Sequence, residues 1–449
     1  MNPRPPPAER SDRPAQTERE AQPARVRELW EKVFSKENLA RALQRVESNR
    51  GAPGIDGMPT SELRGWLKAN WAGIQQALDA GTYRPQPVRR VTIPKPDGGE
   101  RELGVPTVLD RLIQQAIAQV LTEVFDAQFS ERSYGFRPGR SAHQAQRRAR
   151  DYVVAGYDWV IEVDLEKFFD RVQHDALMAR VAREVPEKRL LRLIRRYLEA
   201  GVMVEGVKQA SAEGTPQGSP LSPLLANIML DDLDRELERR GHHFVRYADD
   251  IRVHVKSERA GERVLGGLSE FIEKRLKLKV NKEKSATRRA SKATALGFGF
   301  WLDKQGNVLI GIADKARERV RRRLRKLTER RQRVTMEERI ASLNRFIAGW
   351  SAYFGLAETP SVFEDLDGWL RRRLRQVRWV EWKRPAARRH NLQVLGIPAR
   401  EARSMAGSSL GPWRIAASPV LNRALTNDYW RQQGLIGFTA RWNRRWGRA

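Results

Sequence analysis

Two adjacent aspartates inside an apolar segment constrain the fold of this chain more than any other feature. Tyr247-Ala248-Asp249-Asp250 is flanked by Phe244-Val245-Arg246 and by Ile251-Arg252-Val253-His254-Val255. These flanks predict two short strands, with the paired aspartates at the turn of a hairpin. The upstream run Trp159-Val160-Ile161-Glu162-Val163 predicts another strand, which ends on Asp164. We therefore expect three carboxylates to lie at strand ends.

Carboxylates in this arrangement are suited to hold two Mg²⁺ ions, for which Mn²⁺ is a possible substitute. In nucleotidyl transfer, one ion lowers the pKa of an attacking 3′-hydroxyl and the other neutralises charge on the leaving pyrophosphate. An isolated Asp-Asp pair in a turn is more often ordinary turn chemistry than a metal site. The prediction of Asp164, Asp249 and Asp250 as catalytic metal ligands therefore depends on the rest of the chain.

The charge balance indicates a polyanionic partner. The 449-residue chain has 84 Lys and Arg against 55 Asp and Glu, a formal net charge of +29. This surplus favours nucleic acid over a membrane surface, because no segment reads as purely interfacial and no apolar run approaches the ~20 residues of a transmembrane span. The absence of cysteine excludes disulfides, zinc fingers and thiol nucleophiles, and it suits a reducing cytosol.

The pattern of apolar positions changes near residue 310. Up to about residue 300, strand and helix patterns alternate, which indicates an α+β fold around an antiparallel core. Beyond it, three apolar stripes at helical spacing predict a bundle: Ala316, Val320, Leu324 and Leu327; Ile340, Leu343, Ile347, Trp350 and Phe354; Phe363, Leu366, Leu370, Leu374 and Val377. The other faces of the first helix are crowded with arginine, including Arg321 and Arg325. One sign of charge dominates there, so we expect this face to contact phosphates.

Several short motifs surround the aspartates. In order they are Gly51-Ala52-Pro53-Gly54-Ile55-Asp56-Gly57, Ile93-Pro94-Lys95-Pro96-Asp97-Gly98-Gly99 with Arg101, Ser133-Tyr134-Gly135-Phe136-Arg137-Pro138-Gly139, Val163-Asp164-Leu165-Glu166-Lys167-Phe168-Phe169-Asp170, Thr215-Pro216-Gln217-Gly218, Tyr247-Ala248-Asp249-Asp250 and Leu296-Gly297-Phe298. The second predicts a hairpin with a turn at Pro96-Asp97-Gly98-Gly99. The fifth opens a predicted helix and offers backbone N–H groups to an anion. Through this ordered set the chain resembles the reverse transcriptases of group II introns with their maturase domain, over roughly residues 30 to 449.

The resemblance implies a right-hand polymerase. Fingers and a palm with an antiparallel sheet would occupy residues 27–305, and an all-α thumb or maturase X domain residues 306–388. A small basic DNA-binding region would follow at 389–449. The Pro- and Arg-rich residues 1–26 are not explained by the family and are expected to be a disordered tail.

The resemblance also implies roles for single residues. Asp164 and Asp249 would be the principal metal ligands and Asp250 the third carboxylate. The dNTP-binding residues would be Lys95 and Arg101 on the triphosphate, Phe168 as the gate that excludes a 2′-hydroxyl, and Gln217 near the incoming base pair. Leu296, Gly297 and Phe298 would form the primer grip, and Arg137 with its loop would meet the template, as Arg321 and Arg325 would meet nucleic acid.

The family often ends in a His-Asn-His endonuclease with zinc-binding cysteine pairs. This chain has no cysteine and stops at Ala449, which suggests the compact, endonuclease-less bacterial type, acting in the cytoplasm at the nucleoid.

The resulting hypothesis is an RNA-directed DNA polymerase that binds its intron RNA to assist splicing and retrohoming. Its partners would be intron RNA, a template–primer duplex, target DNA and dNTPs. Two alternatives stay open. One is a splicing maturase whose polymerase site is a relic. The other is a reverse transcriptase recruited elsewhere, for instance to a CRISPR array.

Overall fold

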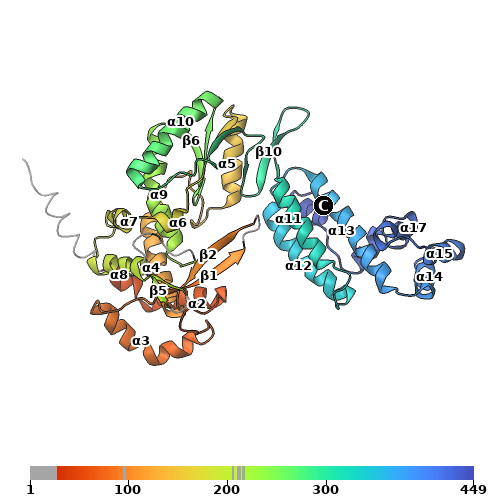
Figure 1. Ribbon diagram of the computed structural model, residues 1–449, viewed down its shortest axis with the longest axis horizontal. Helices are drawn as coiled ribbons and strands as arrows, with labels where there is room; N and C mark the ends of the chain where they lie inside the picture. The colour runs from red at the N-terminus through yellow and green to blue at the C-terminus, as the bar shows by residue number, and fades with distance from the viewer. Residues whose placement is uncertain (1–27, 95–97, 205–206, 210–213, 215–217, 449) are drawn as a thin grey trace, which may run out of the picture. The chain divides into compact units, whose positions relative to one another are not determined.

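The computed structural model describes residues 28–94, 98–204, 207–209, 214 and 218–448 (Figure 1). The chain divides into two compact units. The first comprises Met1–Tyr152 and Gly156–Arg288, and the second comprises Val153–Ala155 and Arg289–Ala449. Each unit has its own hydrophobic core, drawn from residues 30–280 in the first and 312–442 in the second.

A four-stranded sheet lies at the centre of the first unit. Its strand order is β6 (His243–Tyr247), β7 (Asp250–Val255), β3 (Trp159–Val163) and β8 (Ala286–Arg289). Strand β7 pairs antiparallel with both β6 and β3, so the predicted hairpin and the predicted strand before Asp164 are confirmed as neighbours. Helices α9 (Ser222–Arg239) and α10 (Glu258–Phe271) contact this sheet.

A second sheet of the same unit has the order β2-β1-β4-β5. Its strands are β1 (Val88–Pro94), β2 (Glu100–Val105), β4 (Val202–Val204) and β5 (Val207–Gln209). Strands β1 and β2 pair antiparallel from Arg89↔Val105 to Pro94↔Glu100, which confirms the predicted hairpin.

The remaining helices of the first unit surround these sheets. They are α2 (Lys36–Asn49), α3 (Leu63–Asp79), α4 (Val108–Phe125), η1 (Asp126–Gln128), α5 (Ala142–Val154), α6 (Phe168–Arg171), α7 (His174–Val181), α8 (Lys188–Glu199) and η2 (Ile272–Leu276). Helix α4 is buried along most of its length, because its apolar residues recur on nearly every face.

The second unit begins with a small sheet and continues in helices. The sheet order is β11 (Val308–Ile312), β10 (Phe298–Leu302) and β9 (Thr294–Ala295). The helices are α11 (Asp314–Leu327), α12 (Met336–Phe354), α13 (Pro360–Glu381), α14 (Pro385–Val394), α15 (Ala399–Ala406), α16 (Pro412–Ile415), α17 (Pro419–Ala424), α18 (Asn427–Gln432) and α19 (Phe438–Arg445).

Helices α11, α12 and α13 contain the three predicted apolar stripes, which are largely buried in the core of this unit. The start of α12 is fixed by a capping box between Thr335 and Glu338. The units divide at 288/289, so β9, β10 and β11 lie in the same unit as these helices.

None of the helices in the described part of the chain combines the length and the apolar character needed to cross a bilayer.

Candidate active site

The paired aspartates lie at the tip of the β6–β7 hairpin. Tyr247 pairs with Asp250, which leaves Ala248 and Asp249 as the two turn residues. Ala248 has φ 59° and is buried, whereas Asp249 is exposed. Glycine is preferred at positive φ, because a Cβ is unfavourable there. Alanine costs about 1–2 kcal/mol in this conformation, so the surrounding structure must hold this turn.

Asp164 lies next to this turn because of the strand register. Val163 is paired with Ile251, and Asp164 follows Val163 at the end of β3. Its backbone is held by the segment before β8. The Asp164 carbonyl accepts a hydrogen bond from the N–H of Asn281 at 2.8 Å, and the Asp164 N–H donates to Ser285 Oγ at 3.0 Å. All three predicted carboxylates therefore sit at neighbouring strand ends.

The electrostatics around Asp249 reflect this concentration of carboxylates. Exclusion of water by the surrounding protein raises the pKa of Asp249, although the side chain still reaches solvent. The negative charges of Asp250 and Asp164 raise this pKa further, and the positive charge of Arg101 opposes the rise. A divalent cation would lower the same pKa by neutralising the crowded negative charge.

Among the described residues, the three carboxylates do not form a complete metal-binding site. Asp250 forms an ion pair with Arg252, at 2.8 Å between Oδ1 and Nη1. Among the residues that the structure describes, no three acidic or histidine side chains are grouped closely enough to hold a metal ion as they stand. Carboxylate oxygens are the ligands that Mg²⁺ prefers, and the ion pair with Arg252 occupies Oδ1 of Asp250.

The predicted dNTP-binding residues lie on two segments. Arg101 is exposed on β2, opposite Ile93, and its charge reaches Asp249. Lys95 and Gln217 lie outside the described residues. At the described glycines on either side of Gln217, an added Cβ on Gly214 would lie 3.0 Å from the Phe169 carbonyl oxygen, and one on Gly218 would lie 3.1 Å from that of Gly104.

Phe168, the predicted gate residue, is buried, whereas its neighbour Phe169 is more accessible. Phe168 is 3% exposed and belongs to the core of the first unit. Phe169 is half-buried and meets Phe168 edge-on at 5.1 Å. Left-handed Lys167, with φ 47°, reverses the chain just before α6 and sets this orientation. A gate needs an accessible ring, so Phe169 fits the gate role and Phe168 fits the core.

Arg137 has an internal role. Its guanidinium donates to Asp126 Oδ1 at 2.7 Å and to the carbonyls of Ser130 and Ser133 at 2.6 and 2.9 Å. These bonds occupy the side chain that was predicted to meet the template. Its neighbour Phe136 is instead 57% exposed, with φ 58°, and its ring lies 6.4 Å from that of Tyr247. In this loop the exposed aromatic ring is the group available to a nucleobase.

The predicted primer-grip residues belong to the second unit. Leu296 and Gly297 have φ 54° and 84°, and they turn the chain into β10, where Phe298 is fully buried. The Leu296 carbonyl accepts a hydrogen bond from the Tyr353 hydroxyl at 2.8 Å. A Cβ on Gly297 would lie 3.0 Å from the Phe354 ring. Within this unit, the glycine permits close approach of α12.

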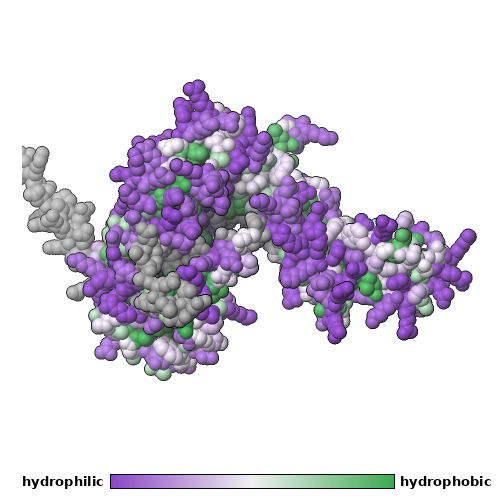
Figure 2. Space-filling view, in the orientation of Figure 1, coloured by the Kyte–Doolittle hydropathy of each residue, from purple (hydrophilic) through white to green (hydrophobic). Residues whose placement is uncertain are grey.

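The arginine-rich face of α11 is hydrophilic, as expected. Arg325 is exposed with its guanidinium over the Trp369 ring, whereas Arg321 is half-buried. In Figure 2 the surface over α11 and α12 is predominantly hydrophilic.

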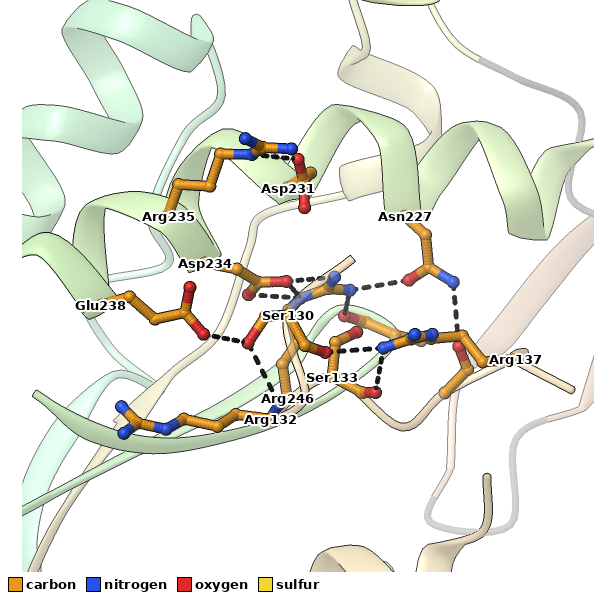
Figure 3. Close-up of polar contacts among 12 residues, drawn as sticks. Ser130, Arg132, Ser133, Arg137, Asn227, Asp231, Asp234, Arg235, Glu238 and Arg246 are labelled. Atoms are coloured by element: carbon orange, nitrogen blue, oxygen red, sulfur yellow. Dashed lines mark hydrogen bonds and ion pairs between the residues drawn. The ribbon is translucent and has the colours of Figure 1, made fainter. Parts of the chain in front are cut away.

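Sequence reasoning missed a buried polar network behind the turn. Arg246 is fully buried in β6 and pairs with Asp234 of α9 at 2.6 Å (Figure 3). The available signals were an arginine inside an apolar strand and an aspartate beside Leu233 and Leu237 on an apolar helix face. Ser285, which holds the backbone of Asp164, gave no comparable signal.

Two family models match the chain. The model described as Reverse transcriptase (RNA-dependent DNA polymerase) matches residues 93–300, and the model described as Group II intron, maturase-specific domain matches residues 317–396.

Among curated proteins, Protein YkfC of Escherichia coli K12 is 38% identical over 222 residues, which cover 48% of this chain and 58% of YkfC. The group II intron-encoded protein LtrA of Lactococcus lactis subsp. cremoris is 28% identical over 333 residues, which cover 60% of this chain and 55% of LtrA. The chain thus spans a little more than half the length of these relatives.

Solved structures with similarity include a chain of a partial Cas6-RT-Cas1–Cas2 complex. It is 29% identical with a TM-score of 0.34, over 54% of this chain and 42% of that one. The match to the reverse transcriptase model is accompanied by the α+β architecture of the first unit, and the maturase-specific match follows it in sequence. By this combination of domains, the chain belongs to the group II intron reverse transcriptase/maturase family.

Proposed function

We propose that this chain is the RNA-directed DNA polymerase of a group II intron, which copies RNA into cDNA and binds intron RNA to assist splicing and retrohoming. The observation that carries the proposal is the strand register beside the turn. It sets Asp164 next to Asp249, whose pKa responds to the charges of Asp164 and Asp250. Crowding of negative charge favours a bound counter-charge, which divalent ions supply.

Asp164 and Asp249 are the proposed principal metal ligands, and Asp250 is the third carboxylate. Bound there, Mg²⁺ ions, with Mn²⁺ as a substitute, would lower the pKa of the primer 3′-hydroxyl and neutralise charge on the pyrophosphate. Arg101, together with Lys95, is proposed to bind the triphosphate from the β1–β2 hairpin. Most of the rate would come from holding the 3′-oxygen in line with the α-phosphate.

The finer architecture follows the same proposal. The β1–β2 hairpin would belong to the fingers, and the sheet β6-β7-β3-β8 would be the palm. The bundle α11–α13 would be the thumb, with the primer grip at Leu296-Gly297-Phe298. The helices from α14 onward would form the basic DNA-binding region. Gln217, which lies outside the described residues, is proposed to contact the incoming base pair.

Helix α11 supports the proposed RNA partner. Its buried stripe leaves Arg319, Arg322, Arg323 and Arg325 exposed on one helix. Each phosphate contact releases condensed counterions, so an Arg325→Gln variant should bind RNA more weakly and with a salt slope smaller by about 1. Glu318→Gln, which removes an exposed acid from the same helix, is the matched control and should not weaken binding.

Two readings compete with this function. In the first, the polymerase site is a relic and the protein acts only on splicing. Retention of Asp164, Asp249, Asp250 and Arg101 in one region argues against it. In the second, the enzyme serves another element, such as a CRISPR array; the maturase-specific match over residues 317–396 favours the intron.

An Asp249→Ala, Asp250→Ala double variant separates the two activities. The proposal predicts loss of cDNA synthesis on an RNA template with Mg²⁺ and dNTPs, and retention of intron RNA binding and splicing assistance. A wild-type protein that assists splicing but extends no primer would establish the relic reading instead.

A further inference from the structure

Arg246 is an unusual residue for the middle of an apolar strand. It is fully buried, and its guanidinium forms a two-pronged ion pair with Asp234, with Nε–Oδ1 at 2.8 Å and Nη2–Oδ2 at 2.6 Å. Burying an arginine and an aspartate is costly, and an apolar pair of similar size would fill the same space. The arrangement therefore calls for a role beyond filling the core.

The third arm of the guanidinium reaches the catalytic turn. Arg246 Nη1 donates to the Ala248 carbonyl at 3.0 Å and to Asn227 Oδ1 at 2.8 Å. Figure 3 shows Arg246 between Asp234 and Asn227, both on α9. The ion pair with Asp234 thus fixes a guanidinium that in turn fixes the backbone just before Asp249.

Asn227 extends the network to the far side of the turn. Its Nδ2 donates to the Gly135 carbonyl at 2.9 Å. Gly135 is packed so closely on the turn that an added Cβ would lie 2.2 Å from the Ala248 nitrogen. The loop is also hydrogen-bonded along β6, through Tyr134 N–H to the Arg246 carbonyl at 2.9 Å.

Two strained residues meet at this contact. Ala248 in the turn and Phe136 in the loop have φ 59° and 58°, in the left-handed region that residues with a Cβ avoid. Strained backbone of this kind persists only where its surroundings fix it, and here the fixing bonds converge from Arg246 and Asn227.

We propose that Arg246, Asp234 and Asn227 are positioning residues that hold the Ala248 turn in its left-handed conformation and so set the position of the Asp249 carboxylate. This inference rests on the proposed polymerase function of Asp249. The network touches no reacting atom. It acts through one backbone carbonyl on each side of the contact, those of Ala248 and Gly135.

Asn227→Leu tests the proposal, because leucine keeps the branched shape of the side chain and removes both hydrogen bonds. The matched control is Asn38→Leu. Asn38 is equally buried in the first unit and donates to the carbonyls of Val33 and Ala116, at 2.8 and 3.0 Å, away from the turn. We expect Asn227→Leu to lower kcat for primer extension at least tenfold with little change in the KM for dNTP, and Asn38→Leu to leave kcat within twofold at a temperature where both are folded.

Ala248→Gly supplies a readout that a loss of stability would not move. Glycine adopts positive φ without strain, so the turn no longer needs the network to hold it. Adding Ala248→Gly to Asn227→Leu should recover a large part of the lost kcat, measured at a temperature where both variants are folded. Arg246→Lys, which keeps a charge for Asp234 but lacks the planar fork, serves as the second variant if Asn227→Leu does not fold, and the same recovery is expected.

The outcomes are distinguishable. Equal kcat in Asn227→Leu and Asn38→Leu would overturn the positioning role, and so would a lack of recovery by Ala248→Gly. In either case, primer extension by the wild-type protein would still support the proposed polymerase function. Absence of primer extension in the wild-type protein would overturn the proposed function itself.

Discussion

The guanidinium of Arg246 donates a hydrogen bond to the carbonyl of Ala248 at 3.0 Å, while its other edge is paired with the carboxylate of Asp234. A fully buried ion pair is therefore coupled directly to the backbone of the aspartate turn. Burying the pair costs free energy, and in return the guanidinium fixes the backbone next to Asp249.

Removing one member of this pair should destabilise the protein strongly. In Asp234→Asn, the buried Arg246 charge loses its counter-charge, which costs about 3–5 kcal/mol for pairs of this kind. Denaturant unfolding followed by tryptophan fluorescence measures the loss. The control is Glu270→Gln, which breaks the exposed Glu270–Lys274 pair and should leave the stability nearly unchanged. A loss below about 1 kcal/mol in Asp234→Asn would mean that the pair does not hold the fold.

Sugar selectivity should depend on Phe169 rather than on Phe168. Phe169→Ala removes the accessible ring, so incorporation of ribonucleotides relative to deoxyribonucleotides should rise. Phe168→Ala should instead cost about 3–5 kcal/mol of stability, because it empties a core position. Single-nucleotide incorporation with matched dNTP and rNTP, beside a melting curve, separates the two effects. Unchanged discrimination in a folded Phe169→Ala protein would return the gate to Phe168.

Arg252 should compete with divalent ions for Asp250. In Arg252→Gln the 2.8 Å ion pair is lost, so Asp250 is free to join Asp164 and Asp249. The Mg²⁺ concentration for half-maximal primer extension should fall about threefold to tenfold, as expected for the loss of one partly buried pair of ~1 kcal/mol. A Mg²⁺ titration of both proteins measures the shift. A higher Mg²⁺ requirement would show instead that Arg252 orients Asp250 for binding.

Stability should fall in acid because of His254. This ring is 2% exposed, and burial lowers its pKa to about 4. Its ring nitrogens lack a hydrogen-bond partner of good geometry among the described residues, although the nearby Tyr157 backbone favours the protonated form. The unfolded chain binds a proton near pH 6.5 and the folded chain only near pH 4, so the contribution is complete above pH 6.5 and is lost as pH falls to 4.

The size of this effect is about 3 kcal/mol, from roughly 2.5 pH units at 1.36 kcal/mol each. Denaturant unfolding at several pH values between 4 and 7 measures it. His254→Phe keeps an aromatic ring and has no proton to bind, so its stability should vary less with pH in this range. Equal pH dependence in the two proteins would assign the acid loss to other groups.

Periodicity and turn chemistry were sufficient to predict the elements that carry the site. The strand before Asp164, the β6–β7 and β1–β2 hairpins and helices α11–α13 each have a local apolar pattern that matches their structure.

Single side chains were harder, because their partners are distant in sequence. Whether Phe168 or Phe169 faces the core depends on the left-handed turn at Lys167, which its identity does not indicate. The internal role of Arg137 depends on Asp126 and two carbonyls of its own loop. Arg246 pairs with Asp234 on a neighbouring helix. An arginine inside an apolar strand can be recognised from the sequence, but the sequence does not show which acidic residue pairs with it.

The polymerase assignment of Asp249 can be measured by single-nucleotide extension of a DNA primer on an RNA template, with the wild-type protein and with Asp249→Asn. We expect Mg²⁺-dependent addition by the wild type and a decrease of about 1,000-fold or more in Asp249→Asn, equivalent to ~4 kcal/mol of lost transition-state stabilisation. Equal addition by the two proteins, with both folded, would contradict this assignment.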